Sequence, residues 1–148
     1  MGFFGLSGKE SNSSNDNLEK SLIGILVKDI MSKQLITAPS TTTIYHISKM
    51  MEQGIGAVLV KKDSATIGII TDRDFAIKVA ANKYPLDTQA EKITSTPLQT
   101  IGSNESILNA AKQMSSKKIR KLVVVEDNVV IGIITSSDLV HQFSKIKK

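Results

Sequence analysis

The stretch GIITDRD at residues 68–74 returns as GIITSSD at residues 132–138. The similarity begins well before this phrase, because Ile30 aligns with Ile93 and apolar positions match from there to the end of each phrase. A chain written twice in this way is a tandem repeat, in which one supersecondary unit occurs in two copies. The repeated phrase therefore predicts a fold built from two similar halves, and its residues are the first candidates for a functional site.

Each copy shows the same order of structural signals. A short extended segment precedes a cluster of Ser, Thr and Asn suited to helix capping, and an amphipathic helix follows. Two runs rich in β-branched residues then flank a polar turn, which predicts a hairpin, and a second helix closes the copy. The expected elements cover residues 35–37, 44–51, 57–60, 67–71 and 72–81, and residues 98–101, 107–114, 122–125, 129–135 and 136–143. This order, β-α-β-β-α found twice, predicts an α+β fold.

The composition along the chain suggests its boundaries. Residues 7–17 are polar and have no apolar period, so a flexible N-terminal arm is expected over residues 1–17. The apolar start MGFFGL is either a short docking segment or a terminus without function. The expected domains are a first repeat with a lead-in helix at 18–83, a linker at 84–89 that contains the breaker Pro85, and a second repeat with a basic tail at 90–148.

The composition also excludes several classes of site. The chain has no cysteine, which rules out disulfides, thiolate metal ligands and a cysteine nucleophile. Neither His46 nor His141 has a carboxylate or a second histidine at metal-ligand spacing, so no metal site is expected. No apolar stretch reaches the roughly 18 residues that span a bilayer, and an N-myristoylation motif fails at Leu6, so a soluble, cytoplasmic protein is expected. A net charge of +5 at pH 7 permits phosphate-bearing partners.

The repeated phrase fits a helix cap and a nucleotide site at once. Thr71 and Asp74, like Thr135 and Asp138, have the spacing of a capping box, in which a hydroxyl and a carboxylate satisfy free amides at a helix start. A helix start also favours a phosphate, and an acidic residue there can accept hydrogen bonds from ribose hydroxyls. The glycine three residues before each threonine either admits a ligand or marks a tight entry into the strand.

From Val27 to Phe143 the sequence resembles a tandem pair of cystathionine β-synthase (CBS) domains. The resemblance rests on the doubled phrase, on VKDIM at residues 27–31, and on the strand starts IGAVLV at 55–60 and IRKLVVV at 119–125. It implies two pseudo-symmetric repeats packed through their sheets, as in a Bateman-type module, with two clefts that commonly bind adenosine-bearing ligands. Such pairs act mainly as regulatory modules.

The resemblance also implies roles for individual residues, with contributions from both repeats to each cleft. In each cleft the aspartate is expected to hold ribose hydroxyls, while the threonine and its neighbour, Arg73 or Ser137, lie toward phosphate. The first cleft is expected to comprise Thr71, Arg73, Asp74, Gln99, Thr100, Arg120 and Lys121. The second is expected to comprise Ile36, Thr37, Gly56, Ala57, Thr135, Ser137 and Asp138.

The two clefts are not expected to be equivalent. The second copy has a basic run where the first copy has the neutral Gly56 and Ala57; this run consists of Lys117, Lys118, Arg120 and Lys121. The run is either part of a ligand site or a solvated surface. If two nucleotides bind, their affinities are expected to differ.

Three classes of function follow from these observations. The leading one is a regulatory module that senses AMP, ADP or ATP, or alternatively S-adenosylmethionine. Such a module is expected to require no cofactor and to modulate an unidentified partner protein. The resemblance also implies a homodimer formed through amphipathic helices. The alternative is a nucleic-acid or ribosome-associated protein that uses the basic surface, although an aromatic content of 4% supplies few base-stacking side chains. An enzyme is not expected, because the sequence shows no metal cluster, nucleophile–base pair or phosphate-binding loop.

Overall fold

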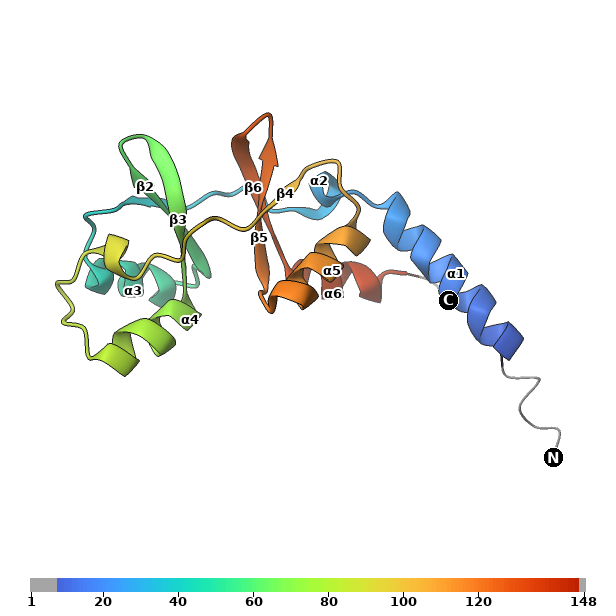
Figure 1. Cartoon of the computed structure of the whole chain (residues 1–148), viewed down its shortest axis with the longest axis horizontal. Helices are drawn as coiled ribbons and strands as arrows, with labels where there is room; N and C mark the ends of the chain where they lie inside the picture. The colour runs from blue at the N-terminus through green and yellow to red at the C-terminus, as the bar shows by residue number, and fades with distance from the viewer. Residues whose placement is uncertain (1–7, 147–148) are drawn as a thin grey trace. The chain divides into compact units, whose positions relative to one another are not determined.

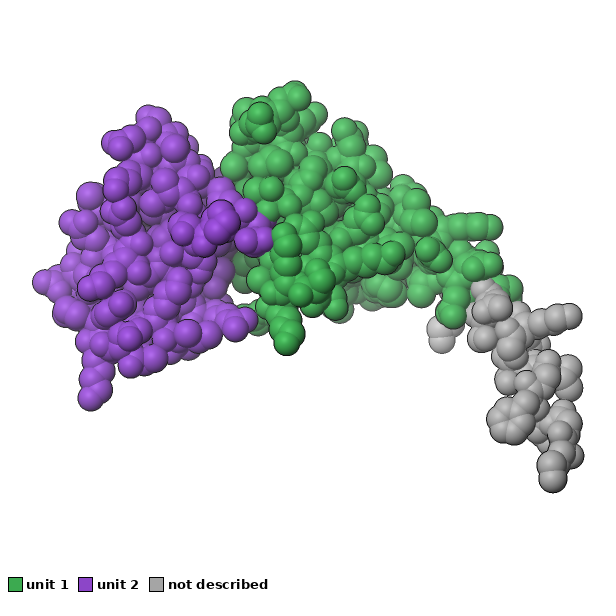
Figure 2. All heavy atoms as spheres, viewed as in Figure 1, with its two compact units in different colours: residues 1–33, 100–148 green, residues 34–99 purple. Residues whose placement is uncertain are grey.

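The computed structural model describes the chain from residue 8 to residue 146, with side-chain surroundings from residue 13 onward (Figure 1). It divides into two compact units (Figure 2). We call residues 34–99 the middle unit, and residues 1–33 together with 100–148 the flanking unit. Each unit contains one three-stranded sheet and its own helices, which confirms the α+β class expected from the sequence.

The middle unit is built on the sheet β1–β2–β3. Strand β1 (Thr37–Pro39) runs parallel to β2 (Ala57–Lys62), which pairs antiparallel with β3 (Ala65–Thr71). Helix α3 (Ile44–Glu52) connects β1 to β2, and β3 leads into α4 (Asp72–Asp74), the π-helical η1 (Phe75–Ala80) and the 3-10 turn η2 (Ala90–Lys92). The core consists of aliphatic side chains that are completely buried: Ile44, Ile47, Val58, Val60, Ile70 and Ile93.

The flanking unit repeats this plan and adds two helices. Strand β4 (Thr100–Gly102) runs parallel to β5 (Lys121–Glu126), which pairs antiparallel with β6 (Val129–Thr135). Helix α5 (Ile107–Lys117) connects β4 to β5, and α6 (Ser136–Ser144) follows β6. The added helices are α1 (Gly8–Gly24) and α2 (Val27–Ile30). The core includes Leu22, Val27, Ile107, Leu122, Val124 and Ile134.

The turn of each hairpin consists of two residues with positive φ. Asp63 and Ser64 have φ values of 50° and 68°, and Asp127 and Asn128 have φ values of 50° and 62°. Positive φ at both central residues is typical of a type I′ turn, whose twist matches that of the flanking strands. The two hairpins expected from the paired β-branched runs are therefore confirmed.

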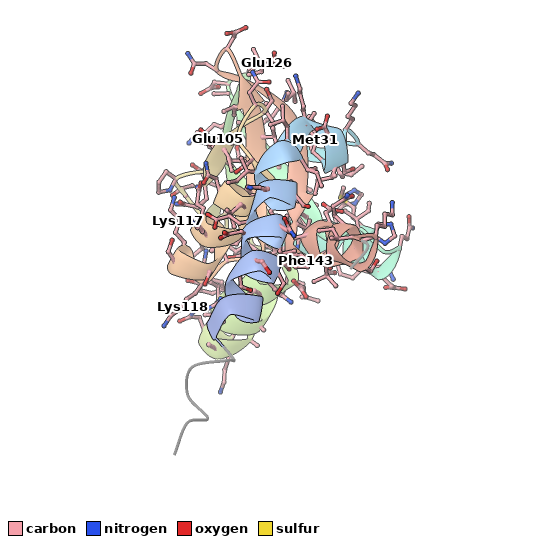
Figure 3. The ribbon with its side chains drawn as sticks, turned by 90° about the vertical axis from the view of Figure 1, so that its right-hand side faces the viewer. Met31, Glu105, Lys117, Lys118, Glu126 and Phe143 are labelled. Carbon is pink, nitrogen blue, oxygen red and sulfur yellow. The ribbon has the colours of Figure 1, made fainter. Side chains whose placement is uncertain are left out.

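Helix α1 differs from the flexible arm expected over residues 1–17. The MGFFGL segment lies outside the described residues, but the chain is helical from Gly8 to Gly24. Leu22 is buried in the core of the flanking unit, Leu18 packs against that core, and α1 contacts α5, the helix that ends at Lys117 (Figure 3). The residues before Leu18 have no apolar period, so their pattern predicts no helix. The packed end supplies a formed turn from which the helix extends, and extension costs less than nucleation.

The short segment before each repeat's sheet pairs with the sheet of the other repeat. We call residues 31–32 and residues 93–96 the lead-in segments. Ser32, before the first repeat's sheet, belongs to the flanking unit and pairs with Ile133 through two backbone hydrogen bonds of 2.9 Å. Ser95, before the second repeat's sheet, belongs to the middle unit and pairs with Ile69 through backbone hydrogen bonds of 2.9 and 3.1 Å. The boundary expected between residues 83 and 90 follows the sequence repeats, whereas the compact units divide after residues 33 and 99.

Candidate functional site

The repeated phrase ends where a strand meets a helix. Strand β3 runs into α4 at Thr71, and β6 runs into α6 at Thr135. The start of the neighbouring strand lies directly across the sheet, because Ala57 pairs with Thr71 and Lys121 pairs with Thr135. We call this edge of each sheet the phrase end.

The phrase end of the middle unit gathers predicted residues from both expected clefts. The backbone N–H of Leu59 donates to the carbonyl of Ile36 at 2.8 Å, and Thr37 pairs with Leu59 in the sheet. This pairing places the start of β1 beside the start of β2, where Ala57 lies across from Thr71. The residues brought together here are Ile36, Thr37, Gly56, Ala57, Thr71, Arg73 and Asp74.

The phrase end of the flanking unit gathers the basic residues and the second aspartate. The backbone N–H of Ser136 donates to the carbonyl of Arg120 at 2.8 Å, so the start of β5 is joined to the start of α6. Thr100 pairs with Val123 on the neighbouring strand, whereas Gln99 belongs to the middle unit. The residues brought together are Thr100, Arg120, Lys121, Thr135, Ser137 and Asp138. Which residues of the two repeats share a ligand stays a prediction.

The two phrase aspartates cap the helices that follow them. The carboxylate of Asp74 accepts a hydrogen bond from the Thr71 backbone N–H at 2.8 Å, and that of Asp138 accepts the equivalent bond from Thr135 at 2.8 Å. The second phrase also has the reverse bond, from the Asp138 N–H to the Thr135 hydroxyl, at 3.2 Å. The capping role expected from the sequence is thus confirmed, and each cap is worth about 0.5–2 kcal/mol.

The phrase glycines admit the lead-in segments. A Cβ atom placed on Gly132 would lie 2.6 Å from the Met31 sulfur and 2.8 Å from the Ser32 carbonyl oxygen. A Cβ atom on Gly68 would lie within 3.0 Å of the backbone of Ser95 and of the methyl group of Thr94. Neither alternative expected for these glycines named another segment of the chain, yet the structure shows that each glycine leaves room for the backbone of such a segment.

Asp74 is buried and has several partners. Its side chain is only 8% exposed. While one carboxylate oxygen caps Thr71, the other accepts a 2.6 Å hydrogen bond from the Ser95 hydroxyl and lies 3.0 Å from the Lys78 ammonium nitrogen. The same ammonium donates to the Ile93 carbonyl at 3.0 Å and to the Ser95 hydroxyl at 3.1 Å. The first phrase aspartate is therefore already neutralised by groups of its own unit.

Asp138 has a different environment, although it occupies the equivalent position. Its side chain is half-buried, and its Oδ2 atom accepts the Thr135 N–H. Among the described residues its Oδ1 atom has no hydrogen-bond or ion-pair partner. Gln142 stands at the position that corresponds to Lys78 in the first copy, so no ammonium is available from that place. This carboxylate can accept hydrogen bonds from a ligand.

The surroundings of Asp138 are basic and open. Lys117, Lys118 and Arg120 are exposed, and Lys121 is half-buried beside the phrase. The start of α6 also borders an open depression of about 410 Å³, lined by Ser136, Ser137, Val140, His141 and Ser144. Hydroxyl groups, cations and a carboxylate thus lie within one unit.

The sequence analysis missed two residues, Lys78 and Ser95, whose contacts neutralise the Asp74 carboxylate. Lys78 lies four residues after Asp74, a spacing at which helical side chains meet, so it could have been found from the sequence. Ser95 lies 21 residues away, and only the folded chain brings it to the carboxylate.

Over residues 8–146 no group of His, Cys, Asp and Glu side chains could hold a metal ion. In the same part of the chain no helix has the length and apolar character needed to cross a membrane.

The amino-acid sequence matches a known protein family. The CBS domain family model matches residues 27–81 and again residues 90–145. An uncharacterized protein of Methanopyrus kandleri is 38% identical over 121 residues, which are 79% of this chain and only 62% of that protein. The CBS domain-containing protein YhcV of Bacillus subtilis is 33% identical over 120 residues, which are 80% of this chain and 86% of YhcV.

Solved structures show the same fold. The CBS domain pair of protein MJ0100, in complex with 5′-methylthioadenosine and S-adenosyl-L-methionine, has a TM-score of 0.73 and 33% identity, covering 82% of this chain and 98% of that pair. An uncharacterized conserved protein from Pyrococcus horikoshii has a TM-score of 0.79 and 25% identity, covering 85% of this chain and 97% of that protein.

Proposed function

Because this chain belongs to the CBS domain family and carries two of its domains in tandem, we propose that it is a regulatory module that binds an adenosyl compound at the phrase end of the flanking unit. The observation that carries the proposal is the Oδ1 atom of Asp138, which has no partner among the described residues. The ligand class is supported by the MJ0100 pair, whose complex contains two adenosyl compounds.

The proposed anchor is a pair of hydrogen bonds from the ribose. The vicinal 2′- and 3′-hydroxyls of an adenosyl compound are donors, and Asp138 offers a carboxylate oxygen that can accept them. Hydrogen bonds to a charged group contribute about 1.5–3 kcal/mol each. The cap from Thr135 holds the carboxylate in place at 2.8 Å, so little side-chain freedom is lost when the ligand binds.

Charge favours an anionic ligand among the adenosyl compounds. Lys121 lies across from Thr135, and the start of α6 presents the positive end of the helix dipole. Both groups attract phosphate, whereas they repel the sulfonium of S-adenosylmethionine. We therefore place AMP, ADP or ATP ahead of S-adenosylmethionine. The ligand contacts expected from the sequence at Ile36, Thr37, Gly56 and Ala57 stay a prediction.

Regulation rather than catalysis is the proposed outcome of binding, and the target is a separate protein. A ligand shifts a conformational equilibrium only by its different affinity for the two states, so the bound and free forms must present different surfaces to the target. Exposed apolar side chains on the helices support a homodimer: Tyr45 on α3 is 52% exposed, and Val140 and Phe143 on α6 are 69% and 44% exposed. Phe143 is labelled in Figure 3.

Isothermal titration with AMP, ADP, ATP and S-adenosylmethionine tests the proposal. We expect the Asp138→Asn variant, which removes the charge but keeps a capping oxygen, to bind the preferred nucleotide about 10- to 100-fold more weakly. The matched control is Glu126→Gln, an exposed carboxylate of the same unit that is labelled in Figure 3 and should bind as the wild type does. Wild-type protein that binds none of the four compounds would refute the proposal.

A second candidate function rests on the basic run at the end of α5. Lys117 and Lys118 are exposed, and Figure 3 shows them at the end of that helix, where they can contact phosphates of a nucleic acid. Such binding should weaken steeply with added salt, because phosphate contacts release counterions. A fluorescence titration of a short RNA that shows no binding at low salt would remove this candidate.

A further inference from the structure

The side-chain amine of Lys78 has three partners: Asp74 belongs to the phrase of the first repeat, and Ile93 and Ser95 belong to the segment before β4. It lies 3.0 Å from the Asp74 carboxylate, and it donates to the Ile93 carbonyl at 3.0 Å and to the Ser95 hydroxyl at 3.1 Å. An ammonium has three N–H donors, so these three acceptors use its whole capacity. Lys78 is therefore a partly buried cation, 35% exposed, whose ammonium is held by groups of the middle unit.

The Asp74 carboxylate is correspondingly occupied. One oxygen accepts the Thr71 backbone N–H at 2.8 Å, and the other accepts the Ser95 hydroxyl at 2.6 Å and faces the Lys78 ammonium. A ribose diol would have to displace both Ser95 and Lys78 from a carboxylate that is only 8% exposed. Removing the cation from a buried carboxylate leaves that charge uncompensated, which is strongly unfavourable.

The lead-in segment of the second repeat keeps this arrangement in place. Ile93 is completely buried in the core of the middle unit, and Ser95 is paired with Ile69 by two backbone hydrogen bonds. Gly68 lets the segment pass close to β3. The hydroxyl of Ser95 is thus fixed by its backbone, and Lys78 bonds to two atoms of the same segment.

We propose that Lys78 acts as a built-in counter-ion that closes the first phrase to diol ligands, so that one chain binds one adenosyl ligand, at Asp138. The inference rests on the proposed function of the flanking unit and assigns its stoichiometry. The second copy lacks the device, because Gln142 stands at the position of Lys78 and the Oδ1 atom of Asp138 has no partner among the described residues. Replacing the ammonium by an amide leaves only the neutral Ser95 hydroxyl to be displaced from the Asp74 carboxylate, and should therefore open a second site.

Calorimetric stoichiometry with ATP tests this assignment in the full chain. Wild-type protein should bind one ATP per chain, and Lys78→Gln, which copies the residue found in the second repeat, should bind two. The second ATP should disappear again in Lys78→Gln combined with Asp74→Asn. The matched control is Lys49→Gln, which removes an exposed lysine paired with Glu52 at 2.8 Å in the same unit and should leave one site.

Two results of this titration would overturn the inference. One is a wild-type protein that binds two ATP per chain and loses one in Asp74→Asn. The other is a folded Lys78→Gln variant, verified by circular dichroism, that still binds one. If Lys78→Gln does not fold, Lys78→Met keeps most of the aliphatic stem and answers the same question.

Amine labelling separates this inference from the proposed function. In wild-type protein without ligand, acylation of Lys78 should be about tenfold slower than that of Lys49, because its amine is held by a buried carboxylate. Asp74→Asn should remove most of that protection. If the wild type bound none of AMP, ADP, ATP and S-adenosylmethionine, the proposed function would fail, whereas labelling of Lys78 at the rate of Lys49 would separately refute the role of Lys78 as counter-ion.

Discussion

Replacing Gly68 with alanine adds a methyl group where the chain has no room for one. The new Cβ atom would meet the Ser95 carbonyl oxygen and the methyl groups of Thr94 and Thr96, all within 3.0 Å. Relief requires the lead-in segment to move away from β3, which breaks the two backbone hydrogen bonds between Ile69 and Ser95. Those bonds contribute about 0.5–1.5 kcal/mol each, and overpacking costs about 1–3 kcal/mol. We expect the free energy of unfolding to fall by about 2–6 kcal/mol.

Urea unfolding followed by circular dichroism measures this loss. Gly102→Ala is the matched control, because its Cβ atom would find its nearest neighbour, the Glu105 Cγ atom, at 3.6 Å, an ordinary contact. That variant should be as stable as the wild type or slightly more stable, since alanine loses less backbone entropy than glycine on folding. If Gly68→Ala and Gly102→Ala had the same urea midpoint as the wild type, the close approach of the lead-in segment would be refuted.

Ser64→Gly tests the hairpin turn, and Leu22→Ala with its control Ile23→Ala tests helix α1, all by the same assay. Ser64→Gly should stabilise the protein by about 0.5–1 kcal/mol, because serine at a φ of 68° carries a left-handed strain that glycine lacks; destabilisation would contradict the type I′ turn. Leu22→Ala should cost about 2–4 kcal/mol, as for other buried leucines, whereas Ile23→Ala, at a side chain 52% exposed, should change stability by less than about 0.5 kcal/mol. Equal effects of these two variants would show that α1 does not pack as described.

Local patterns were enough to predict the strands of each repeat and the helices that connect and follow them. The hairpins follow from paired β-branched runs around a polar turn, and the helix caps follow from a threonine and an aspartate three residues apart. These interactions join residues that are close in the chain, so their geometry is set by the backbone of a single element. Helix α1 from Gly8 to Asn17 was not predicted, because its support comes from packing of Leu18 and Leu22 on α5 rather than from its own composition.

The order of residues is enough to establish the doubled architecture and to place one aspartate at each phrase end, because repetition and short-range spacing are visible in it. It left open what the phrase glycines are for, and it gave Asp74 and Asp138 the same expected role although it predicted clefts of different charge. Both points depend on the folded chain, which brings Ser95 across Gly68 to a carboxylate 21 residues away. Contacts at that separation depend on where the chain crosses the sheet. The phrase aspartate is therefore neutralised in the first repeat, at Asp74, whereas in the second repeat, at Asp138, it can accept hydrogen bonds from a ligand.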